Sequence, residues 1–260
     1  MEHLHHFFQY GPITAVVAYI MACVGAGLGL RCVVRAFATT GSTKRSWLIT
    51  GALAIGSGIW TMHLVAILGF AVDGSPVRFD VGFTLLSLLV AIVVVLIGVF
   101  AVGYTRSRVH GAIIGGISTG VAIVGMHYVG MSAMQIHGTL SYDIATVGLS
   151  VVVAIGAATV ALAVAFLTDG FRGTIVAALL MGAAASITEY TGIAALQIEI
   201  IPGTSVLPGA SAVEFVFPFI VVFGSFLFLS SAFVALSPIK TTRMATVGAG
   251  ANHEPEPGGL

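Results

Sequence analysis

Seven long apolar segments limit this chain to a helical membrane protein. They cover about residues 12–34, 47–71, 81–104, 111–136, 145–168, 174–198 and 215–237. A membrane-spanning helix needs about 20 mainly apolar residues, because the hydrocarbon core of a bilayer is ~30 Å thick. With 58% hydrophobic and 8% charged residues, the chain has too little polar surface for a soluble domain of its length. We therefore expect an all-α integral membrane fold with seven transmembrane helices.

The distribution of basic residues predicts how these helices are oriented. One set of connections, with the end of the first segment and the C-terminal tail, carries nine of the ten Lys and Arg residues: Arg31, Arg35, Lys44, Arg45, Arg106, Arg108, Arg172, Lys240 and Arg243. The other set carries only Arg78. Because cytoplasmic loops are rich in Lys and Arg, this bias places the N-terminus outside and the C-terminus in the cytoplasm, across the cell's inner (cytoplasmic) membrane.

The two ends of the chain are short and polar, so we expect no further domain in them. Residues 1–11 predict a short exoplasmic lead-in without the pattern of a signal peptide. Its His3, His5 and His6 either lie at the membrane surface or gather copper or zinc. Residues 239–260 are rich in Pro and Gly and predict a disordered cytoplasmic tail. The seven-helix domain would then span residues 12–238, and any signal would pass to a separate cytoplasmic or membrane partner.

Three polar residues recur at intervals that indicate an internal repeat. His63 and His127 are 64 residues apart, and Glu189 follows 62 residues later. Each is preceded, seven residues earlier, by a glycine: Gly56, Gly120 or Gly182. Seven residues are about two helical turns, and small residues let membrane helices pack closely. We expect three tandem two-helix repeats around a pseudo-threefold axis, with a seventh helix packed beside them.

The spacing of other polar residues places the three repeated positions at one depth. The next strongly polar residues are Asp73, His137 and Glu199, each ten residues further along the chain. Along a continuous helix that distance is about 15 Å. The nearest preceding basic residues lie 17 to 19 residues earlier. We therefore expect all three positions near the outer face, on the second, fourth and sixth helices.

The residues around the two histidines favour a metal site. Met62 and Met126 directly precede them, and Met131 and Met134 follow the second histidine at i+4 and i+7, on its helix face. Imidazole and thioether groups suit copper, especially Cu(I), better than magnesium or calcium. Glu189, the only carboxylate well inside a span, must be protonated, paired with an imidazolium or bound to metal. Ordinary alternatives are core packing for Met and an interhelical hydrogen bond for His.

The stretch Met126-His127-Tyr128-Val129, together with the earlier Met-His pair, resembles the MHYT family of bacterial integral membrane sensor domains. The resemblance extends over about residues 10–240. It implies a sensor of a diatomic gas such as O2, CO or NO, which works through copper near the outer face. The residues that this implies as ligands are Met62, His63, Met126 and His127.

The third motif departs from the family pattern. It reads Thr188-Glu189-Tyr190-Thr191 and lacks both the Met and the His, and Leu64 replaces an aromatic position in the first motif. A carboxylate can bind copper, but an oxygen ligand favours Cu(II) over Cu(I). We therefore include Glu189 and Met131 among the candidate metal ligands.

Other functions remain open or are excluded. Two histidines at one depth could be axial ligands of haem, and Glu189 with the histidines could line the path of a copper transporter. A retinal Schiff base needs a lysine amine, but Lys44 and Lys240 both lie outside the spans. The zero net charge gives no sign of nucleic-acid binding. The sequence shows no nucleophile paired with a base, so we do not expect an enzyme. Cys23 and Cys32 face opposite sides of one helix, which argues against a disulfide.

Overall fold

The computed structural model describes residues 12–72, 74–167, 170–201, 203 and 206–236. The predicted lead-in, the predicted tail and Asp73 lie outside the described residues. Within the described residues, seven helices are long and apolar enough to cross a membrane, as predicted. They are α1 (Pro12–Phe37), α2 (Gly41–Leu68), α3 (Val81–Tyr104), α4 (Arg108–Met131), α5 (Ile144–Leu167), α6 (Gly170–Ala194) and α7 (Phe217–Leu236), which continues from the π-helical turn η2 (Ala212–Val216).

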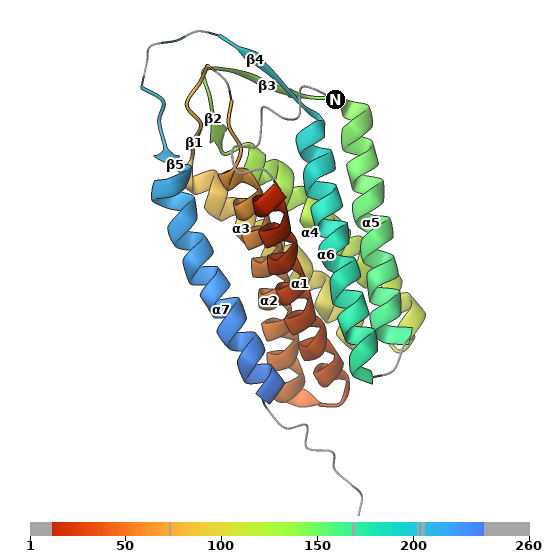
Figure 1. Ribbon diagram of the computed structural model, residues 1–260. Coiled ribbons are helices and arrows are strands. Elements are labelled where there is room, and N and C mark those ends of the chain that lie inside the picture. Colours follow the sequence, from red (N-terminus) through yellow and green to blue (C-terminus); the bar gives the residue numbers. More distant parts are fainter. Residues whose placement is uncertain (1–11, 73, 168–169, 202, 204–205, 237–260) are drawn as a thin grey trace, which may run out of the picture.

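The first six helices form a closed ring. Each packs against the next helix of the chain, and α6 packs back against α1 (Figure 1). The helices α2, α4 and α6 also contact one another across the middle. The most enclosed of these is α2, in which every residue from Ala54 to Ile67 is buried. The second, fourth and sixth helices therefore converge, which a site shared by the three repeats requires.

The repeated glycines set the spacing between neighbouring helices. A Cβ at Gly56 would lie 2.9 Å from the Cα of Ile92 in α3, and a Cβ at Gly120 would lie 2.6 Å from the Cα of Ile155 in α5. A Cβ at Gly182 of α6 would meet the Sγ of Cys23 in α1 and lie 3.2 Å from its backbone nitrogen. We call α2, α4 and α6 the motif helices. Each packs tightly on the next helix of the ring, because its glycine carries no side chain. The predicted packing role of the glycines is confirmed.

The seventh helix lies outside the ring, against α1 and α2 (Figure 1). Trp60 of α2 is fully buried, and its Nε1–H donates to the carbonyl of Thr84 and to the hydroxyl of Ser87. The rings of Phe219 and Phe223 pack edge-on against this indole, with centroid separations of 5.7 and 5.1 Å. Trp60 therefore anchors α7 beside the first repeat.

Short strands tie together the connections at the end of the ring where α2, α4 and α6 terminate (Figure 1). The strand β1 (Arg78–Phe79) pairs antiparallel with β2 (Met134–Gln135) and with β5 (Ala210–Ser211), while β3 (Gly138–Tyr142) pairs antiparallel with β4 (Leu196–Ile200). The register sets Arg78 opposite Gln135 and Ser211. Each of the three connections is thereby joined to another, which fixes this end of the helical bundle.

The motif helices end earlier than predicted, at residues 68, 131 and 194 instead of 71, 136 and 198. In Leu196–Ile200 apolar and polar residues alternate with the period of a strand, a signal that a count of apolar residues overlooks. Two expectations were therefore wrong. Met134 lies in β2 and does not share a helix face with the second histidine, and no continuous helix leads to His137 or Glu199.

Candidate functional site

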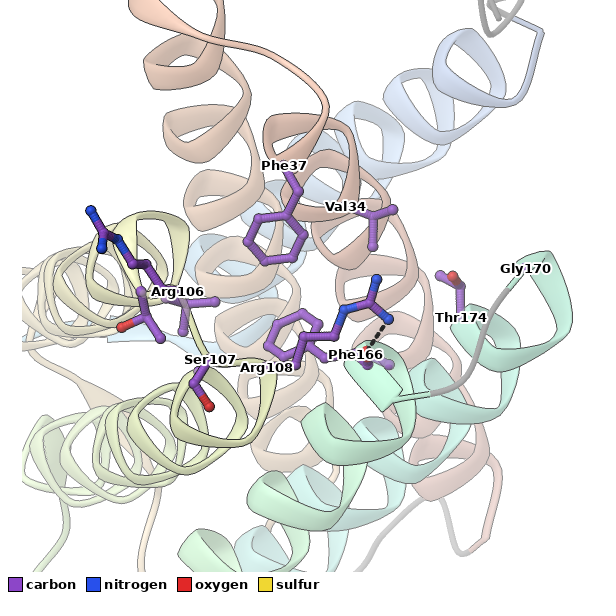
Figure 2. Close-up of a pocket in the computed structure, with 12 residues that line it drawn as sticks. Val34, Phe37, Arg106, Ser107, Arg108, Phe166, Gly170 and Thr174 are labelled. Carbon is purple, nitrogen blue, oxygen red and sulfur yellow. Dashed lines mark hydrogen bonds between the residues drawn. The ribbon is translucent and has the colours of Figure 1, made fainter.

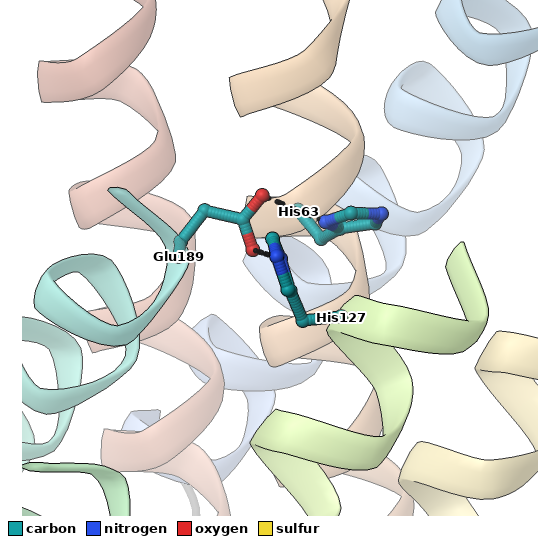
Figure 3. Close-up of side chains that lie close together, drawn as sticks. All are labelled: His63, His127 and Glu189. Atoms are coloured by element: carbon teal, nitrogen blue, oxygen red, sulfur yellow. Dashed lines mark hydrogen bonds and ion pairs between the residues drawn. The ribbon is translucent and has the colours of Figure 1, made fainter. Parts of the chain in front are cut away.

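His63, His127 and Glu189 meet in the middle of the ring, as Figure 3 shows. They come from α2, α4 and α6, and each lies about one turn before the C-terminal end of its helix. His63 is 1% exposed, and the other two side chains are fully buried. The three positions therefore share one depth, at the end of the ring that carries the strands. We call these three residues the triad.

Both imidazoles of the triad are hydrogen-bonded to the same carboxylate. The Nδ1 atom of His63 lies 2.8 Å from Oε1 of Glu189, and the Nδ1 atom of His127 lies 2.9 Å from Oε2. An ionised carboxylate only accepts hydrogen bonds, so in that state each imidazole donates its Nδ1–H. The two rings stand edge to face with centroids 5.5 Å apart. Glu189 thus bridges two helices and fixes the orientation of both rings.

The opposite nitrogen of each ring, Nε2, is buried and has no hydrogen-bond partner among the described residues. Nε2 of His63 packs against Gly130 of α4, and Nε2 of His127 packs against Gly192 of α6. A Cβ at either glycine would overlap the nitrogen. A buried polar atom without a partner is costly, so the close packing of these two nitrogens is a cost that the fold accepts at the triad.

The two glycines were missed in the sequence, although their spacing carried a signal. Gly130 and Gly192 each follow the triad residue of their own helix by three positions. The equivalent residue in the first repeat is Ala66. The glycine of α4 faces the histidine of α2, and the glycine of α6 faces the histidine of α4. By the same order, Ala66 of α2 corresponds to Glu189 of α6, which has no ring. A methyl group is therefore compatible with the third position and not with the first two.

The triad has the donor chemistry of a metal site. One ligand atom from each residue lies within 4.8 Å of the other two. Two imidazole nitrogens with a carboxylate oxygen suit copper or zinc rather than magnesium or calcium. The triad is therefore a candidate site for a transition metal, with copper and zinc both compatible with its donor atoms.

The methionines singled out in the sequence lie in the core around the triad. Met62 and Met126 are fully buried, Met131 is 2% exposed, and all three belong to the main apolar cluster. Successive residues of a helix project about 100° apart, so Met62 and Met126 lie beside the histidines rather than on the same face. Met131 follows His127 by one turn and shares its face. Their role as metal ligands stays a proposal.

Tyr128 connects the triad to the strands. Its ring packs edge-on against His127 and against Tyr142 of β3, with centroid separations of 4.8 and 5.4 Å. Its hydroxyl forms a hydrogen bond of 3.0 Å with the hydroxyl of Ser150 in α5. The residue after the second histidine therefore holds the end of α4 to both α5 and β3.

A cavity of about 290 Å³ opens at the opposite end of the ring, among α1, α3, α4, α5 and α6. Figure 2 shows Arg108 extending across it, where its Nη1–H donates to the carbonyl of Phe166 over 3.2 Å. The carbonyl groups at the C-terminal end of a helix attract cations. Arg108 therefore joins the start of α4 to the end of α5, a structural contact at the basic end of the bundle.

The family model named MHYT, described as a bacterial signalling protein N-terminal repeat, matches residues 56–115 and 120–178. The two matches begin at Gly56 and Gly120, the glycines on which the motif helices pack against the next helix. The repeat thus starts within a motif helix and continues through the helix after it. Along the chain α6 is followed by α7, but in the ring its neighbour is α1.

Curated relatives are signalling proteins of greater length. Two proteins of Pseudomonas aeruginosa, the cyclic di-GMP phosphodiesterase NbdA and the bifunctional diguanylate cyclase/cyclic di-GMP phosphodiesterase MucR, are each 34% identical to this chain, over 209 and 197 residues. These alignments cover 78% and 74% of the chain but only 26% and 29% of the relatives. An uncharacterized signaling protein of Caulobacter vibrioides is 31% identical over 190 residues, which are 73% of the chain and 23% of that protein.

No solved structure matches the chain. The tandem repeat matches, the signalling relatives and the seven membrane-spanning helices agree with one another. The chain therefore belongs to the MHYT family of bacterial membrane signalling proteins.

Proposed function

We propose that this chain is a membrane-embedded sensor whose triad, His63, His127 and Glu189, binds copper near the outer face of the cytoplasmic membrane. The stimulus would be a diatomic gas, namely O2, CO or NO, or a change of redox state. The observation that carries this proposal is the convergence of three fully buried donor groups from three repeats. Ionisable groups at such depth are costly in a membrane and are usually retained for function.

The residues of the triad have separate roles in this proposal. Glu189 contacts both Nδ1 atoms and so fixes the two rings beside its own carboxylate, which would be the oxygen ligand. The burial of all three side chains excludes water from the centre. Met131, on the helix face of His127, would be the first candidate for a soft sulfur ligand, and Met62 and Met126 beside the histidines would be further candidates. Copper bound here would supply a centre that binds diatomic ligands and changes oxidation state.

A change at the triad would act on three helices at once, because each of its residues belongs to a different motif helix. These helices run the full length of the bundle. Altered bonding near one end would therefore change their packing at the other end. The stimulus must favour one of two such packings if it is to produce a signal. We propose that a separate protein receives the signal and that the chain itself has no enzymatic activity. Two relatives bear the names of cyclic di-GMP enzymes, so an enzyme of that class is the first partner to test.

The alternatives have less support from the geometry. Haem would need axial nitrogens on both sides of a porphyrin, whereas both Nδ1 atoms face Glu189 and both Nε2 atoms abut glycines. A copper-handling or transport protein would use the triad to line a path, and copper uptake into proteoliposomes would distinguish it from a sensor. The orientation with the N-terminus outside, in the inner membrane, also remains a proposal based on the basic connections.

The metal content of the purified protein tests the proposal. The chain would be purified in detergent, loaded with copper, desalted and measured by elemental mass spectrometry and by visible absorbance. We expect stoichiometric copper in the wild type, loss of copper in the double variant His63→Ala/His127→Ala, and retention in the control His137→Ala. A wild type without copper, or a double variant with as much copper as the wild type, would falsify the copper site. An intense visible haem band would instead support the haem-binding alternative.

A further inference from the structure

A groove on the outside of the bundle lies between α1, α6 and α7. It has a volume of about 530 Å³ and is lined by residues between Cys23 and Arg31 on α1, between Phe171 and Leu179 on α6, and between Phe228 and Ala232 on α7. Its walls are mostly aliphatic and aromatic, and Arg31 is its one charged lining residue among those described. Because these helices span the membrane, the groove faces the lipid.

Arg31 lies at one end of this groove, six residues before the end of α1 at Phe37. Six helical residues correspond to about 9 Å, and the 26 residues of α1 exceed the roughly 20 that cross the hydrocarbon core, so Arg31 lies within the span near its basic end. The side chain is half-buried, and its Cζ lies 5.4 Å from the centroid of the Phe171 ring. No hydrogen bond or ion pair joins Arg31 to another described residue, whereas Arg108 donates to a backbone carbonyl.

Among the described residues, no carboxylate lines the groove beside Arg31. A guanidinium carries five N–H donors, and unsatisfied donors are expensive where water is scarce. The contact with Phe171 covers one face of the guanidinium but accepts no hydrogen bond in the plane of the group. The remaining lining of the groove offers apolar contact only, apart from a thiol and two hydroxyls.

An anionic phospholipid has the two parts that this groove requires. Its phosphate is a bidentate acceptor for a guanidinium, and its acyl chain is an apolar filling for the walls. The volume lies within the range of about 300–1,000 Å³ that is usual for small-molecule sites. Arg31 also lies toward the basic end of the bundle, which attracts anionic headgroups. We propose that this groove binds an acyl chain of an anionic phospholipid, whose phosphate Arg31 holds.

Charge separates this occupant from the others that an apolar groove could take. A neutral molecule, or an apolar helix face of a second copy of this chain, would cover the walls but would add no anionic acceptor to the described surroundings of Arg31. A zwitterionic lipid carries a phosphate but also a cation, which opposes binding beside a guanidinium. The anionic headgroup is therefore the feature that the site selects.

Native mass spectrometry of the full chain in detergent, with phosphatidylglycerol or phosphatidylcholine added, tests the proposal. One basic residue near an anionic headgroup contributes about a fivefold preference, so we expect phosphatidylglycerol to be retained about fivefold better by the wild type. Arg31→Ala should remove this preference, and Arg31→Lys should keep part of it. Ala232→Phe should fill the groove and reduce the retention of both lipids.

The matched control is Arg35→Ala, because Arg35 is on the same helix but lies over Trp47, outside the groove. It should retain phosphatidylglycerol as the wild type does. Equal losses in Arg31→Ala and Arg35→Ala would mean general attraction of anionic lipid to the basic end and would overturn the proposal. Unchanged retention in Arg31→Ala, or a dimer that Ala232→Phe abolishes, would do the same. Copper content, measured on the same samples, reports on the triad independently of the lipid result.

Discussion

The third repeat differs from the first two at the point where all three meet. The first two repeats place an imidazole on the axis of the ring, at His63 and His127, and the third places a carboxylate there, at Glu189. The backbone positions are equivalent, since each lies about one turn before the end of a motif helix. The chemistry is complementary, because the carboxylate accepts a hydrogen bond from each ring.

This difference teaches that a pseudo-symmetric scaffold can hold an asymmetric centre. Three imidazoles would offer no anionic acceptor to one another, whereas one carboxylate satisfies an N–H of each ring and fixes both orientations. The surrounding small residues follow the same division. Gly130 and Gly192 face the rings, and Ala66 occupies the remaining equivalent position. The glycines thus accompany the two imidazoles, and the alanine belongs to the remaining equivalent position.

Removal of the Glu189 carboxylate, by which the third repeat differs from the other two, should have the largest effect on stability. The variant Glu189→Ala leaves two buried imidazoles without their shared acceptor, so we expect the free energy of unfolding to fall by about 3–5 kcal/mol. Denaturant titration of the protein in detergent measures this loss. Glu199→Gln removes an exposed carboxylate from β4 and should leave stability nearly unchanged. Equal stability of the two variants would mean that the bridge contributes nothing.

Addition of a methyl group next to each ring tests the first two repeats separately. In Gly130→Ala and Gly192→Ala the new Cβ would overlap Nε2 of His63 or His127, and overpacking of this kind costs about 1–3 kcal/mol. Gly156→Ala in α5 is the matched control, since a Cβ there meets nothing within 4 Å. Denaturant titration should rank both test variants below the control. If all three variants unfold together, the rings have room to move and the glycines have no special role.

Acidification tests a carboxylate outside the buried centre, Asp143 at the start of α5. The expected effect on local stability is the smallest of those predicted. Asp143 accepts hydrogen bonds from the hydroxyl and the backbone N–H of Thr146, at 2.6 and 2.8 Å, and these bonds lower the pKa of Asp143 below its ordinary value of 3.8. A lowered pKa in the folded state stabilises the start of α5 above the ordinary pKa. This contribution is lost as the pH falls through the folded-state pKa.

Hydrogen exchange of the first turn of α5 measures this effect. We expect its amide protection to decrease slightly on acidification in the wild type, and the pH dependence to disappear in Asp143→Asn. Thr146→Val removes the hydroxyl bond and should move the loss of protection to a higher pH. A pH dependence that persists in Asp143→Asn would assign the effect to another group.

Much of the helical fold follows from local features of the sequence. Hydropathy predicts the seven spans, because a backbone in lipid must satisfy its hydrogen bonds within a helix. The recurrence of His63, His127 and Glu189, each with a glycine two turns earlier, predicts both the repeat and the common depth. The ends of the motif helices were not predicted, because apolar strands and apolar helix ends look alike when only hydropathy is counted.

The centre itself required the tertiary structure. The sequence by itself determined that three polar residues lie at one depth in three equivalent helices, because spacing along a helix fixes height. It left the state of Glu189 open, since the rotation of each helix about its axis and the closure of α6 against α1 involve residues far apart in the chain. Only the folded ring decided that one carboxylate bridges both Nδ1 atoms and that each Nε2 lies against a glycine.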